Sequence, residues 1–85
     1  MVQQVSSLEQ IILSKVLEVL HREGGIELHT ELRNEGLDSI KTIELIVNLE
    51  IEFDIQIDDQ DLLIENFSSI YKISELLTNT YGLQQ

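Results

Sequence analysis

The segment Gly36-Leu37-Asp38-Ser39-Ile40 and the helix that it opens determine how the rest of the chain can be arranged. The apolar pattern after this segment predicts a helix from about Ile40 to Phe53. When its residues are placed at about 100° per residue, one side carries an apolar stripe, as expected of a helix that packs on a core. That stripe consists of Leu45, Ile46, Leu49 and Phe53, with Thr42 among them.

A second apolar stripe lies on nearly the opposite side of the same helix. It consists of Ile40, Ile43, Val47 and Ile51, with Glu44 and Asp54 beside it. A surface helix needs only one apolar face, so the second is either covered by another part of the chain or offered to a partner. Because so short a chain has few apolar residues to spare for two faces of one helix, the pattern favours a partner.

Ser39 lies at the predicted start of this helix. The first N–H groups of a helix lack intrahelical acceptors, and the peptide dipoles sum there to a partial positive charge that favours an anion. Two interpretations follow. In one, Asp38 or Ser39 is simply the N-cap. In the other, the Ser39 hydroxyl is the covalent attachment point of a phosphodiester, whose charge the helix N-terminus accommodates. Local spacing does not separate them.

The wider sequence does separate them. The segment 36–40 is followed by Ile43-Glu44-Leu45-Ile46, by Leu49-Glu50 and by Glu52-Phe53-Asp54. This run of about 19 residues resembles the carrier proteins of fatty acid, polyketide and nonribosomal peptide synthesis. An earlier long helix and the segment Asn66-Phe67-Ser68-Ser69-Ile70 also fit that family. The resemblance implies that Ser39 carries 4′-phosphopantetheine, loaded from coenzyme A.

The same resemblance implies a set of partners and contact residues. Asp38 and Ile40 flank the serine as contacts for a phosphopantetheinyl transferase. The residues expected to bind acyl- or aminoacyl-loading and condensing enzymes are Leu37, Glu44, Val47, Glu50, Ile51 and Glu52. Ser39 has no histidine partner in a motif, and nothing assembles a base, nucleophile and oxyanion donor. The chain is therefore expected to be a substrate of enzymes and not an enzyme. It is also expected to be a monomer.

Three departures from the fatty acid carriers bear on the pathway. Lys41 replaces a usual acid, Ile51 interrupts an acidic run, and the span from Phe53 to Ile70 is long. The first two departures alter the usual partner signature, and the long span resembles discrete peptidyl, polyketide or D-alanyl carriers. Together they favour a freestanding carrier of a specialised pathway. A carrier of primary fatty acid synthesis is the alternative, and an unmodified acidic helical adaptor is the alternative from another class.

Calcium binding is a further alternative. The segment from Asp54 to Glu65 has acids at the first, fifth and twelfth positions of an EF-hand loop. Asp59 occupies the sixth position, where glycine is needed, and Asp61 the eighth, so a solvated acidic cluster is favoured and no metal site is predicted. His21 and His29 match no ligand spacing and are predicted to be surface residues.

Composition limits the class of protein. The 85 residues predict one domain over 1–85, and 16 acidic against five basic residues give a net charge of −11, which disfavours nucleic acid as a partner. Without cysteine, any thiol must come from a cofactor. No apolar segment approaches the roughly 20 residues of a membrane span, and the start lacks a basic and apolar leader, so a cytoplasmic protein is expected.

The remaining elements follow from periodicity and caps. A helix is predicted from near Ser7 to Arg22 or Glu23, with a Ser6/Glu9 capping box and Gly24-Gly25 at its end. The loop from Gly24 to Asp38 is expected to be anchored by four apolar residues, Ile26, Leu28, Leu32 and Leu37, and to hold a short turn over 30–34.

The second half is predicted to contain two helices. Ile55 and Ile57 pack a loop, and a short helix capped by Asp58 runs from about Asp59 to Ile64. Ser68 or Ser69 then caps a final helix that ends at Gly82 and turns four residues inward, Ile70, Ile73, Leu76 and Leu77. The predicted fold is all-α, a small four-helix bundle of three longer helices and one short helix.

Overall fold

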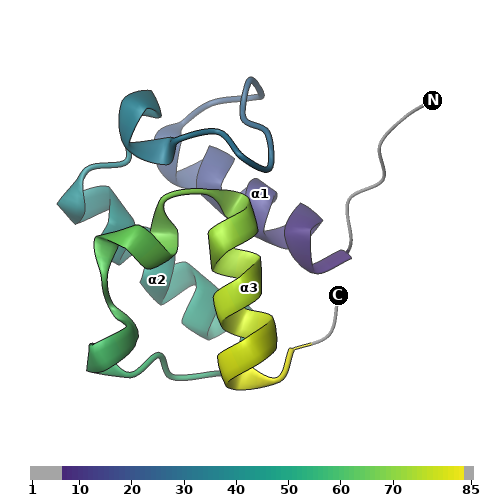
Figure 1. Cartoon of the computed structure of the whole chain (residues 1–85). Coiled ribbons are helices and arrows are strands. Elements are labelled where there is room, and N and C mark those ends of the chain that lie inside the picture. Colours follow the sequence, from purple (N-terminus) through teal and green to yellow (C-terminus); the bar gives the residue numbers. More distant parts are fainter. Residues whose placement is uncertain (1–6, 84–85) are drawn as a thin grey trace.

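The computed structural model describes residues 7–83, and this part of the chain is helical without any strand. Its three α-helices are α1 (Ser7–Leu20), α2 (Ser39–Phe53) and α3 (Ile70–Tyr81) (Figure 1). Three short 3₁₀ turns, η1 (Leu32–Glu35), η2 (Asp59–Asp61) and η3 (Ile64–Phe67), lie in the connections. The all-α prediction is confirmed, with three α-helices in place of four.

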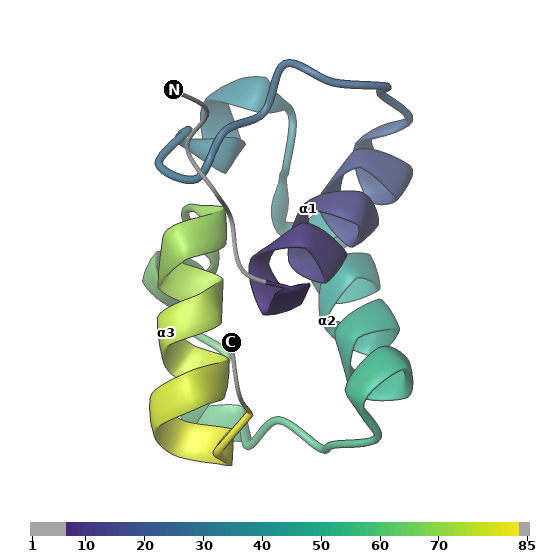
Figure 2. The same cartoon turned by 90° about the vertical axis from the view of Figure 1, so that its right-hand side faces the viewer.

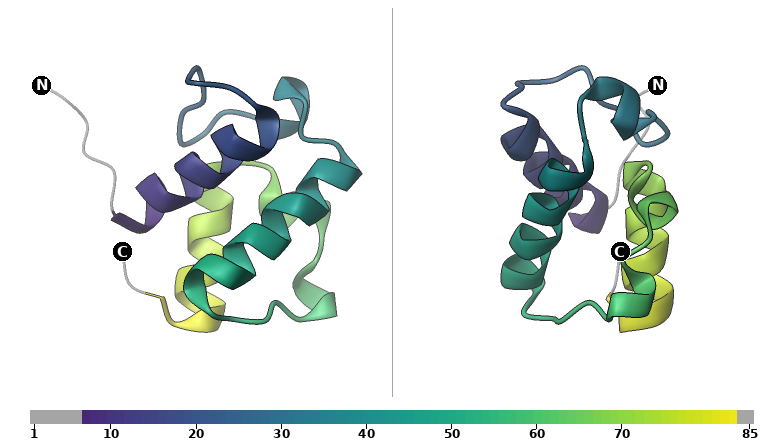
Figure 3. Two further views of the ribbon diagram at one scale, coloured as in Figure 1. Left: turned by 180° about the vertical axis from the view of Figure 1, so that it is seen from behind. Right: turned by 90° about the vertical axis from the view of Figure 1, so that its left-hand side faces the viewer.

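The three helices enclose one core. Helix α1 packs against both α2 and α3, while η3 lies beside α3 and also contacts α2 (Figures 2 and 3). Each helix contributes fully buried residues: Ile12, Val16, Leu45, Leu49, Ile73 and Leu77. Phe67 of η3 is buried with them. The apolar residues of each helix therefore face one common core. None of the described helices has the length and hydropathy needed to cross a bilayer.

Helix α1 ends earlier than predicted. The backbone of His21 has a φ of 58°, and Arg22 donates its N–H to the Leu17 carbonyl at 2.9 Å. His21 itself donates its N–H to the Glu18 carbonyl at 3.2 Å, so these two bonds satisfy two of the last four carbonyls of the helix before the glycines are reached. The prediction that Gly24-Gly25 ends this helix is therefore wrong. Of the expected capping box, Ser6 lies outside the described residues.

The loop between α1 and α2 is fixed by apolar anchors and by two backbone hydrogen bonds. Leu32 donates its N–H to the Ser68 carbonyl at 2.8 Å, and Tyr71 donates to the Leu28 carbonyl at 2.9 Å. Three of the predicted anchors are buried and Leu28 is half-buried, the buried ones being Ile26, Leu32 and Leu37. The predicted turn over 30–34 is present as η1, slightly later in the chain. The loop is thereby held against the start of α3.

The short helix predicted from about Asp59 to Ile64 is matched only in part, because the connection between α2 and α3 contains no α-helix. In its place stand the single turns η2 and η3, and Asp58 makes no side-chain cap. The Asp61 carbonyl of η2 accepts a hydrogen bond from Asn66 Nδ2 of η3 at 2.9 Å, which joins the two turns. Ile57 is buried and Ile55 half-buried, as predicted for a packed loop.

Tyr81, in the last turn of α3, is hydrogen-bonded to the connection between α2 and α3. Its hydroxyl accepts a hydrogen bond from the Asp58 N–H and donates one to Asp61 Oδ2, both at 2.8 Å. Burial raises the pKa of Tyr81, and the hydrogen bond to the Asp61 carboxylate acts in the same direction, whereas the Asp58 N–H lowers it. The phenol therefore bonds as a neutral group.

Helix α3 begins and ends as predicted. The Ser69 side chain accepts the Lys72 N–H at 3.2 Å, and Gly82 follows the helix with a φ of 71°. A residue in this left-handed region closes many helices, and glycine adopts it without strain. Ile70, Ile73 and Leu77 are buried and Leu76 is half-buried.

Candidate functional site

Ser39 is the first residue of α2 and its side chain is exposed. The residue before it, Asp38, is the N-cap: Asp38 Oδ1 accepts the Lys41 N–H at 2.8 Å. The Asp38 carbonyl also accepts from the Thr42 N–H at 2.9 Å and from Thr42 Oγ1 at 2.7 Å. Because Asp38 does the capping, the Ser39 hydroxyl bonds to no other described residue and is open to reagents from solution.

The turn before α2 fixes where this serine lies. Leu37 is 2% exposed and donates its N–H to the Leu32 carbonyl at 3.0 Å. Gly36, with a φ of 108°, joins η1 to this residue in a conformation that other residues rarely adopt. Leu37 was predicted to contact partners, but the structure places its side chain in the core. Its role is to anchor the chain directly before Asp38 and Ser39.

A shallow depression adjoins the serine. It is lined by five residues, Arg33, Leu37, Asp38, Ser39 and Thr42. Arg33 belongs to η1, is exposed, and was not singled out from the sequence, since no motif or helical period relates it to Ser39. The fold alone brings this cation to the depression.

These residues suit an anionic group bound covalently to the serine. The hydroxyl is an accessible nucleophile, the helix N-terminus contributes a partial positive charge, and Arg33 adds a full one. The donor set thus matches a phosphodiester better than an apolar or cationic group.

The exposed face of α2 begins directly after the serine. Its four apolar residues, here called the α2 stripe, are Ile40, Ile43, Val47 and Ile51, and they are 72%, 61%, 46% and 75% exposed. The opposite stripe is buried at Leu45, Ile46 and Leu49 and half-buried at Phe53. The assignment of the two faces from helical angles is therefore confirmed, and the described residues leave the α2 stripe uncovered.

The acidic residues of α2 differ in their surroundings. Glu44 is exposed beside the α2 stripe and, with Asn48, borders a shallow apolar depression on it. Glu50 is half-buried, and its Oε2 accepts the Ile57 N–H at 2.8 Å. Glu52 lies 3.4 Å from Lys15 Nζ of α1. Glu50 therefore supports the fold directly, while Glu44 faces solvent.

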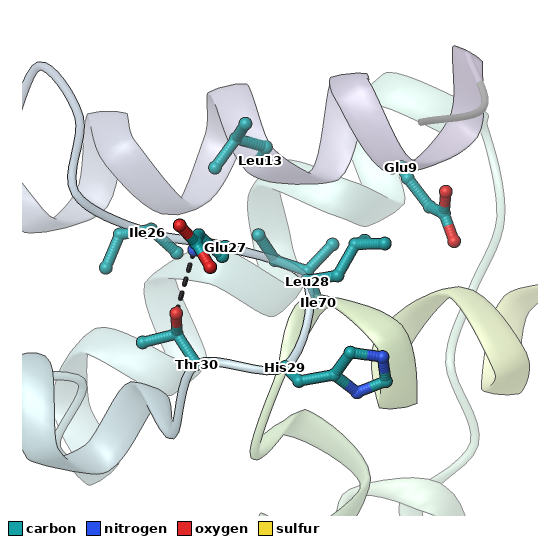
Figure 4. Close-up of a pocket in the computed structure, with 8 residues that line it drawn as sticks. All are labelled: Glu9, Leu13, Ile26, Glu27, Leu28, His29, Thr30 and Ile70. Atoms are coloured by element: carbon teal, nitrogen blue, oxygen red, sulfur yellow. Dashed lines mark hydrogen bonds between the residues drawn. The ribbon is translucent and has the colours of Figure 1, made fainter. Parts of the chain in front are cut away.

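A further pocket, separate from the depressions at Ser39 and on α2, lies between α1, the first loop and the start of α3 (Figure 4). Its apolar lining comes from Leu13, Ile26, Leu28 and Ile70, and its polar lining from Glu9, Glu27, His29 and Thr30. None of the predicted site residues is among them. The His29 ring lies 4.8 Å from that of Tyr71, and both histidines are exposed, as predicted. Over residues 7–83, no three histidine or carboxylate side chains are grouped closely enough to hold a metal ion.

Comparison with known proteins identifies the family. The sequence pattern described as the phosphopantetheine attachment site matches residues 10–77. Aminoacyl carrier protein 2 of Bradyrhizobium diazoefficiens is 31% identical to this chain over 74 residues, which cover 84% of this chain and 83% of that protein. No solved structure gives a significant match. The chain belongs to the phosphopantetheine-binding carrier proteins.

Membership of this family has direct consequences. The prosthetic group is 4′-phosphopantetheine, bound covalently, and the cysteine-free chain depends on it for a thiol. Carrier proteins are acted on by modifying and biosynthetic enzymes and are not catalytic, so this chain is a carrier and not an enzyme. The resemblance drawn from residues 36–54 is confirmed.

Proposed function

We propose that Ser39 is the attachment residue and that residues 1–85 act as one carrier domain for acyl or aminoacyl groups. The observation that carries the proposal is the exposed Ser39 hydroxyl at the start of α2, left without a capping role by Asp38. When attached, the phosphopantetheine arm supplies the thiol that holds the cargo as a thioester. A tethered cargo meets successive enzymes at high effective concentration and does not diffuse away.

A phosphopantetheinyl transferase performs the loading step in this proposal. The Ser39 oxygen attacks the phosphorus of coenzyme A that bears pantetheine, and a new P–O bond forms. The pyrophosphate bond to that phosphorus breaks, adenosine 3′,5′-bisphosphate leaves, and the hydroxyl proton passes to a base. Asp38 and Ile40 flank the serine and are exposed, which supports their proposed role as transferase contacts.

The proposed cargo is aminoacyl or acyl, in a polyketide or nonribosomal-peptide type of pathway or another specialised one. The likeness to a protein named aminoacyl carrier protein 2 favours an aminoacyl group. Lys41 and Ile51 depart from the acidic pattern expected of fatty acid carriers, and the connection from Asp54 to Ser69 is long. Primary fatty acid synthesis stays the alternative pathway.

The proposed docking surface for loading and condensing enzymes is the α2 stripe with Glu44. Val47 and Ile51 supply apolar contact, and the surrounding acids raise the encounter rate with a basic partner surface. Glu50 and Glu52 were also predicted to bind partners; their bonds to the Ile57 N–H and to Lys15 make them weaker candidates than Glu44. Action as a monomer in the cytoplasm is part of the same proposal.

Intact mass spectrometry tests the attachment site. Wild type, Ser39→Ala and Ser14→Ala are each incubated with coenzyme A, magnesium and a broad-specificity phosphopantetheinyl transferase. Ser14 is an exposed serine of α1 and serves as the matched control. Wild type and Ser14→Ala should gain one phosphopantetheine arm, and Ser39→Ala none. An arm on folded Ser39→Ala, or none on folded wild type, would refute the proposal.

A further inference from the structure

The basic residues are distributed unevenly between ion pairs and solvent. Lys15 pairs with Glu18 and Glu52, at 3.8 and 3.4 Å, and Arg22 pairs with Glu35. Among the described residues, the three cations without an ion pair are Arg33, Lys41 and Lys72. Arg33 lines the depression that contains Ser39, and Lys41 follows that serine by two residues. A chain with a charge of −11 thus keeps one cation without an ion pair, Arg33, in the depression that contains Ser39.

The backbone of Arg33 is held in place. Its carbonyl accepts the Gly36 N–H at 3.3 Å, and the neighbouring Leu32 is fully buried. Because Leu37 is also buried, both ends of the segment from η1 to α2 are anchored in the core. Only rotation of the Arg33 side chain can therefore move its guanidinium relative to Ser39.

The acids around Arg33 are already engaged or turned to solvent. Glu35 pairs with Arg22, and Asp38 Oδ1 accepts the Lys41 N–H. Glu31, directly before η1, is exposed. A phosphodiester on Ser39 would add a negative charge beside the Asp38 carboxylate, and like charges at such short range repel. Arg33 lines the same depression, and its guanidinium can offset this repulsion and bind two phosphate oxygens at once through its planar fork.

We infer that Arg33 is a positioning residue that binds the phosphodiester of the arm carried by Ser39. The inference rests on the proposed attachment at Ser39. Arg33 holds the phosphate end of the arm against η1 and so restricts the directions in which the arm leaves the protein. The thiol end remains free to enter partner enzymes.

The test compares four holo proteins, wild type, Arg33→Gln, Arg33→Lys and Lys72→Gln, by ³¹P NMR. Lys72 is an exposed, unpaired cation of α3, so Lys72→Gln makes the same charge change away from the depression. Arg33→Gln should narrow the ³¹P line about twofold as the phosphate gains internal motion. Lys72→Gln should leave the line unchanged, and Arg33→Lys should be intermediate, because it keeps the charge but loses the fork.

Intact mass measured on each sample separates this inference from the proposed function. If wild type gains no arm at Ser39, the attachment proposal fails. If loaded, folded Arg33→Gln has the line width of wild type, or if Lys72→Gln changes it equally, the inference about Arg33 is overturned. If Arg33→Gln is not loaded, the test is the NMR signal of the Arg33 Nε–H group in wild type. This signal should shift when the apo protein becomes holo. An unchanged signal overturns the inference.

Discussion

Glu50 and Glu52 are two residues apart on α2 and have different physical roles. Glu50 Oε2 accepts a hydrogen bond from the N–H of Ile57, a residue that is 4% exposed. Glu52 makes a partly exposed ion pair with Lys15. A buried N–H that loses its acceptor pays its full desolvation cost, whereas an exposed ion pair contributes little. The fold therefore depends more on Glu50 than on Glu52.

Replacing these two acids should reveal the difference in stability. Glu50→Ala is expected to lower the free energy of unfolding by about 1–3 kcal/mol, since it leaves the Ile57 N–H without its acceptor. Glu52→Ala, which removes the same charge, should lower it by less than about 1 kcal/mol. Glu50→Gln keeps an acceptor oxygen and should lie between them. Denaturant titrations measure all three, and equal losses for Glu50→Ala and Glu52→Ala would show that the Ile57 bond is unimportant.

Helix α2, at the scale of a single element, combines a core face with an exposed face. Leu49 is fully buried, and Ile51, two residues later, is 75% exposed. Truncating a core side chain loses transfer free energy and adds the cost of a cavity. Truncating an exposed side chain loses little transfer free energy and leaves no cavity. The two faces can therefore be told apart by stability alone.

Truncation of both faces should give unequal losses. Leu49→Ala is expected to cost about 2–5 kcal/mol of unfolding free energy. Phe53→Ala should cost less than Leu49→Ala, because Phe53 is half-buried whereas Leu49 is fully buried. Val47→Ala and Ile51→Ala should each cost less than half as much as Leu49→Ala. If all four variants unfold at the same denaturant concentration, the α2 stripe is covered in solution.

The elements also show which features the sequence could predict. Local signals located α2, its two faces, the Ser69 cap and the end at Gly82, because each depends on residues within a turn or two. The proposed attachment at Ser39 was likewise predicted from the local Asp38–Ser39 motif. The division of the predicted short helix into two 3₁₀ turns could not be predicted, because contacts such as the Tyr81–Asp61 hydrogen bond join residues 20 positions apart. Arg33 was missed because only the folded path through Gly36 brings it to Ser39.

The whole molecule carries its charge on a small body. A net charge of −11 is confined to a chain with a radius of gyration of 11.9 Å. This radius is close to the Debye length of about 10 Å at 0.1 M salt, so acids on different elements repel one another when the salt concentration is low. Such self-repulsion opposes the compact state.

The melting temperature should therefore rise with salt between about 0.01 and 0.5 M, because ions screen this repulsion. A variant with Asp59→Asn and Glu65→Gln removes two exposed negative charges and should show a smaller rise. Thermal unfolding followed by circular dichroism measures both proteins. A melting temperature that is independent of salt would mean that the charges are too far apart to destabilise the fold.

Tyr81 links the final turn of α3 to η2 through bonds that span 23 and 20 residues, to Asp58 and Asp61. Because these two hydrogen bonds join segments far apart in the sequence, we expect the two segments to open together as one cooperative unit. This unit lies beyond the end of α2, and the bonds that hold Leu32, Leu37 and Asp38 do not pass through it (Figure 1). In the native ensemble, this end of the molecule is therefore expected to fluctuate while the end that carries Ser39 keeps its geometry.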